Sequence, residues 1–128
     1  FAQIDYQQEM AFVALDKEGE ILGDVRTWTD ADQLQAEFSV LVSDKAQGLG
    51  LGSLLMNKMI AYCKGKGTIE MKGTVLSDNG PMLKLADKLG FKIKRRLEGN
   101  VVEIRLPLNE VSQEWHRLRL EDLHKSKK

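Results

Sequence analysis

Alternating apolar and polar positions predict a series of short β-strands along this chain. Strand-like runs at 10–15 and 20–28 are joined by a polar turn that contains Gly19, which is typical of a hairpin. A third strand is expected over 34–42, because strict alternation places the two kinds of side chain on opposite faces. The apolar face of this strand consists of Ala36, Phe38, Val40 and Val42.

After residue 50 the apolar residues recur at helical spacing. Leu51, Leu55 and Met59 lie about one turn apart, so a helix is expected over about 50–64. Glycines at 65 and 67 end this helix, and residues 68–76 then have the character of a fourth strand.

A second helix and a second hairpin are expected in the following segment. The helix starts near Asn79 and Pro81, because asparagine accepts bonds from unpaired backbone N–H groups and proline suits a first helical turn. Gly90 ends it as a left-handed cap. Runs at 91–98 and 101–107 then flank a Gly-Asn turn, which indicates a hairpin.

This order of elements predicts an α/β (α+β) fold with a mixed, mostly antiparallel sheet flanked by helices. The helix after the third strand supplies a single crossover connection. We expect one domain over 1–108 and a helical tail over 109–128, where Val111, Trp115 and Leu118 share one side of a helix.

Composition narrows the classes of protein that this chain can represent. With 128 residues and 42% hydrophobic content, the chain is long enough for a single core. Nineteen basic and nineteen acidic residues cancel, which argues against general binding to nucleic acid or to a membrane surface. Cys63 has no partner for an internal disulfide, and no apolar stretch is long enough to span a bilayer, so the cytoplasm is the simplest location.

No metal site is expected from the sequence. His116 and His124 lack a neighbouring cluster of cysteine or carboxylate side chains at ligand spacing. Cys63 follows Met59 and Ile60 within a predicted helix, where a core thiol is much more common than a nucleophile.

A glycine-rich loop precedes the first predicted helix. It consists of Gln47, Gly48, Leu49, Gly50, Leu51, Gly52 and Ser53. Glycines leave the backbone accessible, and the unpaired N–H groups and dipole of a helix N-terminus favour an anion such as phosphate. Packing alone is the alternative explanation. The lysine of a mononucleotide P-loop is missing, and Ser53 stands where a dinucleotide fingerprint has its third glycine.

Taken with two further motifs, this loop resembles that of GNAT acyl-CoA N-acyltransferases over about residues 8 to 107. The further motifs are Asn79, twelve positions before Phe91, and the ending Lys88-Leu89-Gly90-Phe91. The resemblance implies that the amides of 47–53 bind the coenzyme A pyrophosphate and that Asn79 contacts the pantetheine arm, although helix capping explains Asn79 equally well. It also implies that the arm pairs with the strand end formed by Val40, Leu41 and Val42.

The segments 37–42, 48–52 and 54–56 more closely resemble the acetyltransferase domain of bacterial Pat-type protein lysine acetyltransferases, as do 4–6 and 9–14. That resemblance implies acetyl-CoA as donor and protein lysines as acceptors, such as those of metabolic acyl-CoA synthetases. It also implies an acyl-CoA-synthetase-like region before this domain. The chain is then a fragment without the family's first strand and early helices, and its exposed sheet edge is expected to favour dimerisation.

Within this resemblance, Glu37 corresponds to the general base. A lysine amine is almost entirely protonated at pH 7, so direct attack on a thioester requires a base, and a partly buried Glu37 carboxylate is the candidate. A glutamate that only pairs with a neighbouring strand is the alternative. The oxyanion would be stabilised by a backbone N–H near Val40.

One position departs from the family pattern. Ala86 stands where many GNAT enzymes have a tyrosine that protonates the leaving thiolate, so the acid remains unassigned. Lys84 and Lys88 are candidates for contact with the adenosine phosphates, or are simply solvated. The alternatives to a protein lysine acetyltransferase are an enzyme acting on a small amine or a protein N-terminus, and a non-catalytic acyl-CoA sensor.

Overall fold

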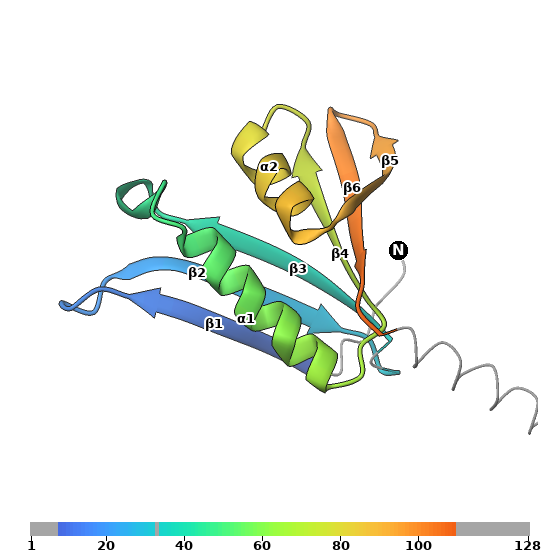
Figure 1. The fold of residues 1–128 in the computed structure, drawn as a ribbon, viewed down its shortest axis with the longest axis horizontal. Coiled ribbons are helices and arrows are strands. Elements are labelled where there is room, and N and C mark those ends of the chain that lie inside the picture. Colours follow the sequence, from blue (N-terminus) through green and yellow to red (C-terminus); the bar gives the residue numbers. More distant parts are fainter. Residues whose placement is uncertain (1–7, 33, 110–128) are drawn as a thin grey trace, which may run out of the picture.

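A computed structural model describes residues 8–32 and 34–109, which form one six-stranded sheet with two helices (Figure 1). The strand order is β1-β2-β3-β4-β6-β5, and β3 with β4 is the one parallel pair of neighbours among the described strands. The mostly antiparallel α+β fold is therefore confirmed. The expectation of a single crossover is wrong, because α2 makes a second one from β4 past β6 to β5. The elements are β1 (Gln8–Leu15), β2 (Ile21–Thr29), β3 (Gln35–Val42), the 3-10 turn η1 (Asp44–Ala46), α1 (Leu51–Gly65), β4 (Glu70–Leu76), α2 (Gly80–Leu89), β5 (Lys92–Leu97) and β6 (Val101–Pro107).

The predicted elements agree with the observed ones to within about two residues at most of their ends. Strand β4 begins at Glu70 rather than at residue 68, and α2 is capped after Leu89 by Gly90, whose φ of 98° is left-handed as expected. Apart from Asn109, the predicted helical tail over 109–128 lies outside the described residues, as do residues 1–7. Neither α-helix of the described ranges has the length and apolar surface needed to traverse a bilayer.

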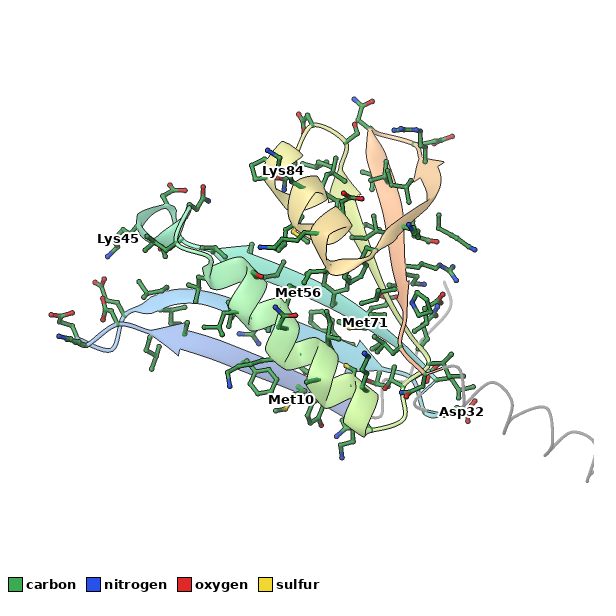
Figure 2. The ribbon with its side chains drawn as sticks, viewed as in Figure 1. Met10, Asp32, Lys45, Met56, Met71 and Lys84 are labelled. Atoms are coloured by element: carbon green, nitrogen blue, oxygen red, sulfur yellow. The ribbon has the colours of Figure 1, made fainter. Side chains whose placement is uncertain are left out.

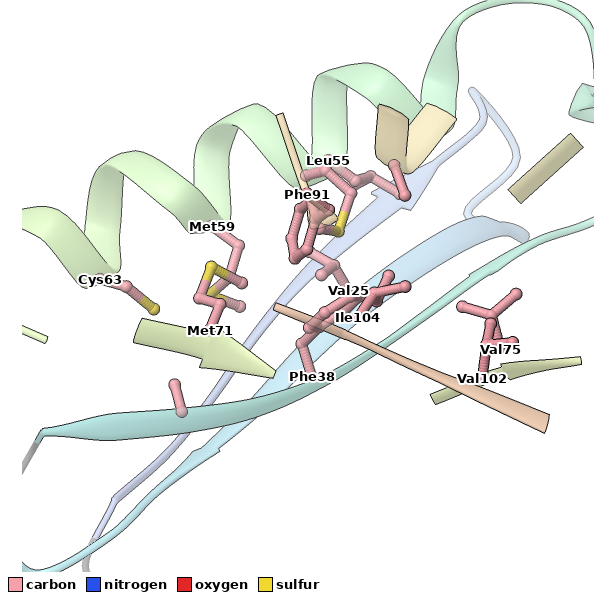
Figure 3. Close-up of a cluster of buried hydrophobic side chains, with 13 residues drawn as sticks. Val25, Phe38, Leu55, Met59, Cys63, Met71, Val75, Phe91, Val102 and Ile104 are labelled. Atoms are coloured by element: carbon pink, nitrogen blue, oxygen red, sulfur yellow. The ribbon is translucent and has the colours of Figure 1, made fainter. Parts of the chain in front are cut away.

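Both helices cover the same face of the sheet. Their inward side chains and the inward side chains of β2, β3, β4 and β6 form one buried cluster (Figure 3). The predicted alternation of β3 is confirmed, since Ala36 and Phe38 are buried while Ser39 and Leu41 are exposed. The opposite face of the sheet is covered by neither helix.

The parallel pairing between β3 and β4 is short. It comprises Gln35 with Glu70, Ala36 with Met71, and Glu37 with Lys72. Beyond this point the two strands diverge, as Figure 1 shows, and we call the diverging region the fork.

A ring packed on a glycine occupies the closed end of the fork. A Cβ atom placed on Gly73 would lie 2.5 Å from Cε1 of Phe38, so the Phe38 ring rests on the bare backbone of β4. The ring also packs against Phe91, with centroids 5.3 Å apart. We attribute the divergence of the strands to this aromatic wedge, because it stands where the next register pair would form.

Candidate functional site

The glycine loop connects the open end of β3 to the N-terminus of α1. Gly48 and Gly50 have φ values of 82° and 80°, a left-handed conformation that strains other residues. Gly50 is the N-cap of α1, and no side chain caps this end of the helix. The loop is therefore shaped by glycine backbone and leaves the helix end open.

The backbone N–H groups of this loop are available to a ligand. The first hydrogen bond of α1 runs from the Leu54 N–H to the Gly50 carbonyl. The N–H groups of residues 48–53 donate no bond to a backbone carbonyl of the described residues. The first turn of α1 also contains no acidic side chain that would satisfy the helix dipole. Such a row of free donors at a helix N-terminus favours a phosphate group.

The three glycines have different roles. A Cβ at Gly48 or Gly50 would meet no atom within 4 Å, so packing does not explain these two. A Cβ at Gly52 would lie 3.2 Å from Leu85 of α2 and 3.7 Å from Val42. The packing alternative thus applies to Gly52, while Gly48 and Gly50 are required by backbone conformation.

The strand leading to the loop has an unpaired edge. Successive residues of a strand direct their backbone groups to opposite sides, and Leu34 and Ala36 face β4. Val40 and Val42 face the same side, but the pairing with β4 ends at Glu37. Nε2 of Gln47 lies 3.4 Å from the Val42 carbonyl oxygen, at the end of this edge. An extended ligand with amide groups can pair here.

Leu41 differs from its two neighbours. By the same alternation its backbone faces β2, where its register partner is Asp24. Its side chain is 69% exposed on the face of the sheet without helices. Of the three predicted arm-binding residues, Val40 and Val42 therefore have a backbone edge that no described strand pairs with, and the Val42 carbonyl accepts a bond from the Gln47 side chain.

Glu37 lies at the closed end of the fork, on the sheet face without helices. Its side chain is 44% exposed, and its Oε1 lies 3.3 Å from Nζ of Lys72 on β4. On its other side the register partner is Trp28 of β2. The ion pair named as the alternative role of Glu37 is thus present, and the carboxylate remains open enough to meet a substrate.

A second charged group stands directly beside this pair. Arg105 of β6 lies 3.0 Å from Glu70 and 3.0 Å from Glu103. Its hydrogen bond to Glu103 is the main cause of a raised guanidinium pKa. Glu70 also accepts a bond from Gln35. Glu70 is thus bound by Arg105 and Gln35, whereas Lys72 forms its ion pair with Glu37.

The remaining predicted residues lie mainly on α2. Oδ1 of Asn79 accepts a bond from the Met82 backbone N–H at 3.2 Å, so its capping role is confirmed while its contact with a ligand stays a prediction. Ala86 is buried. Lys84 and Lys88 are exposed, and Figure 2 shows Lys84 on α2.

Cys63 is a core residue, as predicted. Its side chain is 1% exposed and points from α1 toward the sheet (Figure 3). Burial raises the pKa of the thiol to about 11, against a weaker opposing effect of the bond with Thr27. A thiol with this pKa is protonated at neutral pH and is a poor nucleophile.

Other candidate sites are sparse in the described ranges. No group of three or more metal-ligating side chains occurs there. A cavity of about 250 Å³ lies between α2, β5 and β6, and none of its lining residues comes from the glycine loop or from β3.

Two site features were missed by the sequence analysis. Gly73 interrupts an otherwise regular strand, which signals close approach of another group, but only the fold identifies that group as Phe38. Lys72 was read only as a strand residue, and its position opposite Glu37 depends on the β3–β4 register.

Comparisons with known proteins agree with this architecture. The model of the acetyltransferase (GNAT) family matches residues 1–91. Acetyltransferase PA5475 of Pseudomonas aeruginosa is 38% identical over 91 residues, which are 69% of this chain and 49% of that protein. Acetyltransferase Pat of Mycolicibacterium smegmatis is 31% identical over 90 residues, 69% of this chain and 27% of that protein. The chain thus spans about half of one relative and about a quarter of the other.

A solved structure has the same fold. The phosphinothricin acetyltransferase of Sinorhizobium meliloti, in complex with acetyl-CoA, superposes with a TM-score of 0.68 at 23% identity, covering 78% of this chain and 61% of that one. The family model covers well over half of the sequence. The chain belongs to the acetyltransferase (GNAT) family.

Proposed function

We propose that this chain is an acetyl-CoA-dependent N-acetyltransferase domain that acetylates lysine side chains of proteins. The observation that carries the proposal is the continuous backbone surface from Val40 to Ser53. An unpaired strand edge leads there directly into a loop of free amides at a helix N-terminus. This surface matches the two chemical parts of coenzyme A, an amide-rich arm and a diphosphate.

On the donor side, the pantetheine arm pairs with the edge at Val40 and Val42, and the diphosphate binds the amides of residues 48–53. These donors are fixed by the sheet and by α1, so little ordering accompanies binding. The thioester carbonyl then lies beside Val40, and its N–H stabilises the oxyanion that forms on attack. Asn79, on the facing side of the fork, is the proposed side-chain contact to the arm.

On the acceptor side, Glu37 is the proposed general base. A lysine amine with its usual pKa near 10.4 must lose a proton before it attacks. The ion pair with Lys72 supports this role, because an alkylammonium group already lies beside the Glu37 carboxylate. Attack is direct, since the Cys63 thiol is buried and protonated. With Ala86 at the position of the usual acid, coenzyme A leaves as a thiolate that takes a proton from its surroundings.

The resemblance of residues 37–42, 48–52 and 54–56 to Pat-type protein lysine acetyltransferases supports protein lysine as the acceptor, and it implies an acyl-CoA-synthetase-like region as the attached partner. A small amine is the second candidate acceptor, because the structural relative is named for phosphinothricin, a small molecule. Incubating the chain and acetyl-CoA with an acyl-CoA synthetase, and in parallel with free polyamines, separates these acceptors. Faster acetylation of the protein supports the proposal, and faster acetylation of the polyamines contradicts its acceptor assignment.

Calorimetric titration with acetyl-CoA tests the donor site. Binding by the wild-type chain is expected, and binding without any turnover on either acceptor would instead support a non-catalytic acyl-CoA sensor. Absence of binding would contradict the proposed function as a whole.

A further inference from the structure

We propose that Lys72 is a self-acetylation site, because its amine already lies where an acceptor amine would meet Glu37. The inference rests on the proposed function, since it requires acetyl-CoA in the fork and Glu37 as base. It adds a modification site within the same chain and a competitor for the acceptor position.

The register of the sheet places the two groups together. Glu37 and Lys72 are the last paired residues before β3 and β4 diverge, and both side chains emerge on the face without helices. Nζ of Lys72 lies 3.3 Å from Oε1 of Glu37, and the lysine side chain is 25% exposed. The amine is therefore held at the carboxylate rather than extended into solvent.

The other charges near Lys72 are engaged elsewhere. Glu70 and Glu103 both form ion pairs with Arg105 of β6, and the register partner of Arg105 on β4 is Lys72. Because Arg105 engages both of these carboxylates, the carboxylate that the Lys72 ammonium contacts is that of Glu37. Transfer to the thioester requires movement, because Val40 lies three residues beyond Glu37, roughly 10 Å along the strand. The flexible four-carbon stem of lysine permits such a swing along the open fork.

The chemical step balances within the proposed site. One proton of the Lys72 ammonium passes to the Glu37 carboxylate, and the neutral nitrogen attacks the thioester carbonyl. A C–N bond forms, the C–S bond breaks, and the second proton leaves the nitrogen for the coenzyme A thiolate. The product is a neutral amide that no longer forms an ion pair with Glu37, so the modification frees the base for an external amine.

The chain contains a matched control. Lys45 also forms an ion pair with a glutamate, Glu20, but it belongs to η1 before the glycine loop (Figure 2). Its side chain is 68% exposed, compared with 25% for Lys72. Chemical acetylation that depends on exposure alone therefore favours Lys45, whereas acetylation directed by the fork favours Lys72.

The test is site-resolved mass spectrometry of the full chain incubated with acetyl-CoA alone. We expect Lys72 to be acetylated at least about tenfold faster than Lys45, at a rate per chain that is independent of protein concentration. Glu37→Gln should reduce the Lys72 rate to that of Lys45. Lys72→Arg should abolish the fast modification and preserve acetyl-CoA binding, since arginine keeps the charge. Urea-denatured chain should lose the preference.

Three results would overturn the inference. If Lys72 reacts no faster than Lys45 in a chain that still acetylates an external amine, self-acetylation is wrong and the proposed function stands. If the rate rises in proportion to protein concentration, the transfer occurs between copies rather than within one chain. If the chain binds no acetyl-CoA, the inference fails together with the proposed function.

Discussion

The glycine loop and the Glu37–Lys72 pair lie at opposite ends of the fork and present different chemical groups. The loop offers backbone N–H groups whose positions depend on the left-handed φ values of Gly48 and Gly50. The pair offers two charged side chains whose meeting depends on strand register. The first region is therefore sensitive to backbone conformation, and the second to side-chain chemistry.

The largest expected effect belongs to the side-chain end. In the Glu37→Gln variant we expect turnover to fall about 100-fold or more, because a general base typically contributes that much. The acetyl-CoA dissociation constant should change by less than about twofold, since Gln keeps the shape of the side chain. Steady-state kinetics and calorimetry measure the two quantities separately. Unchanged turnover would remove Glu37 as the base.

The wedge between the two regions is expected to be the next most sensitive position. A Gly73→Ala substitution places a Cβ 2.5 Å from the Phe38 ring, and such overpacking typically lowers the free energy of unfolding by about 1–3 kcal/mol. Urea denaturation measures this change. Gly65→Ala in the last turn of α1 is the matched control, because its Cβ meets nothing within 4 Å and alanine favours the helix. Equal stability of the two variants would contradict the wedge.

The backbone end can be altered without touching a charge. Gly50→Val is expected to weaken acetyl-CoA binding about tenfold or more, because a β-branched residue is strained at a φ of 80°. Relief of this strain changes the backbone conformation of the loop and turns its N–H groups away from the diphosphate. Calorimetry measures the dissociation constant. Leu49→Ser in the same loop should bind normally, since that side chain is already 78% exposed. Similar loss in both variants would mean that the Leu49 side chain, and not the backbone, forms the site.

Cys63 provides the smallest expected effect and excludes a third chemical group. Cys63→Ala should keep turnover within about twofold if attack is direct.

The same thiol makes the stability of the chain depend on pH. Because burial raises the thiol pKa from 9.0 to about 11, the wild-type chain gains stability from this group below pH 9 and loses it as the pH rises toward 11. At pH 10 the loss is about 1 kcal/mol relative to pH 8. Denaturation of Cys63→Ala, which lacks this component, is the reference. A loss of turnover in this variant would indicate an acyl-cysteine intermediate.

The same contrast explains how much the sequence alone could predict. The loop was identified from the order of glycines and the helical spacing that follows, both of which are local patterns. The elements were predicted for the same reason, since alternation in β3 and the cap at Asn79 depend on neighbouring residues. The position of Glu37 on the polar face of β3 was also available from alternation.

The contents of the fork depend on pairing between distant segments. Lys72 meets Glu37 only because β3 and β4 pair in parallel with one particular register, which a crossover of this length leaves open. The packing of Phe38 on Gly73 depends on the same register. Periodicity locates residues on a face of a strand, but it does not determine which residue of the next strand lies opposite.

A crystal structure of the chain with acetyl-CoA tests the central claim most directly. We expect diphosphate oxygens about 2.7–3.2 Å from backbone nitrogens of residues 48–53, and the thioester beside the N–H of Val40. A diphosphate bound elsewhere, for example in the cavity between α2, β5 and β6, with the loop amides facing solvent, would contradict the account.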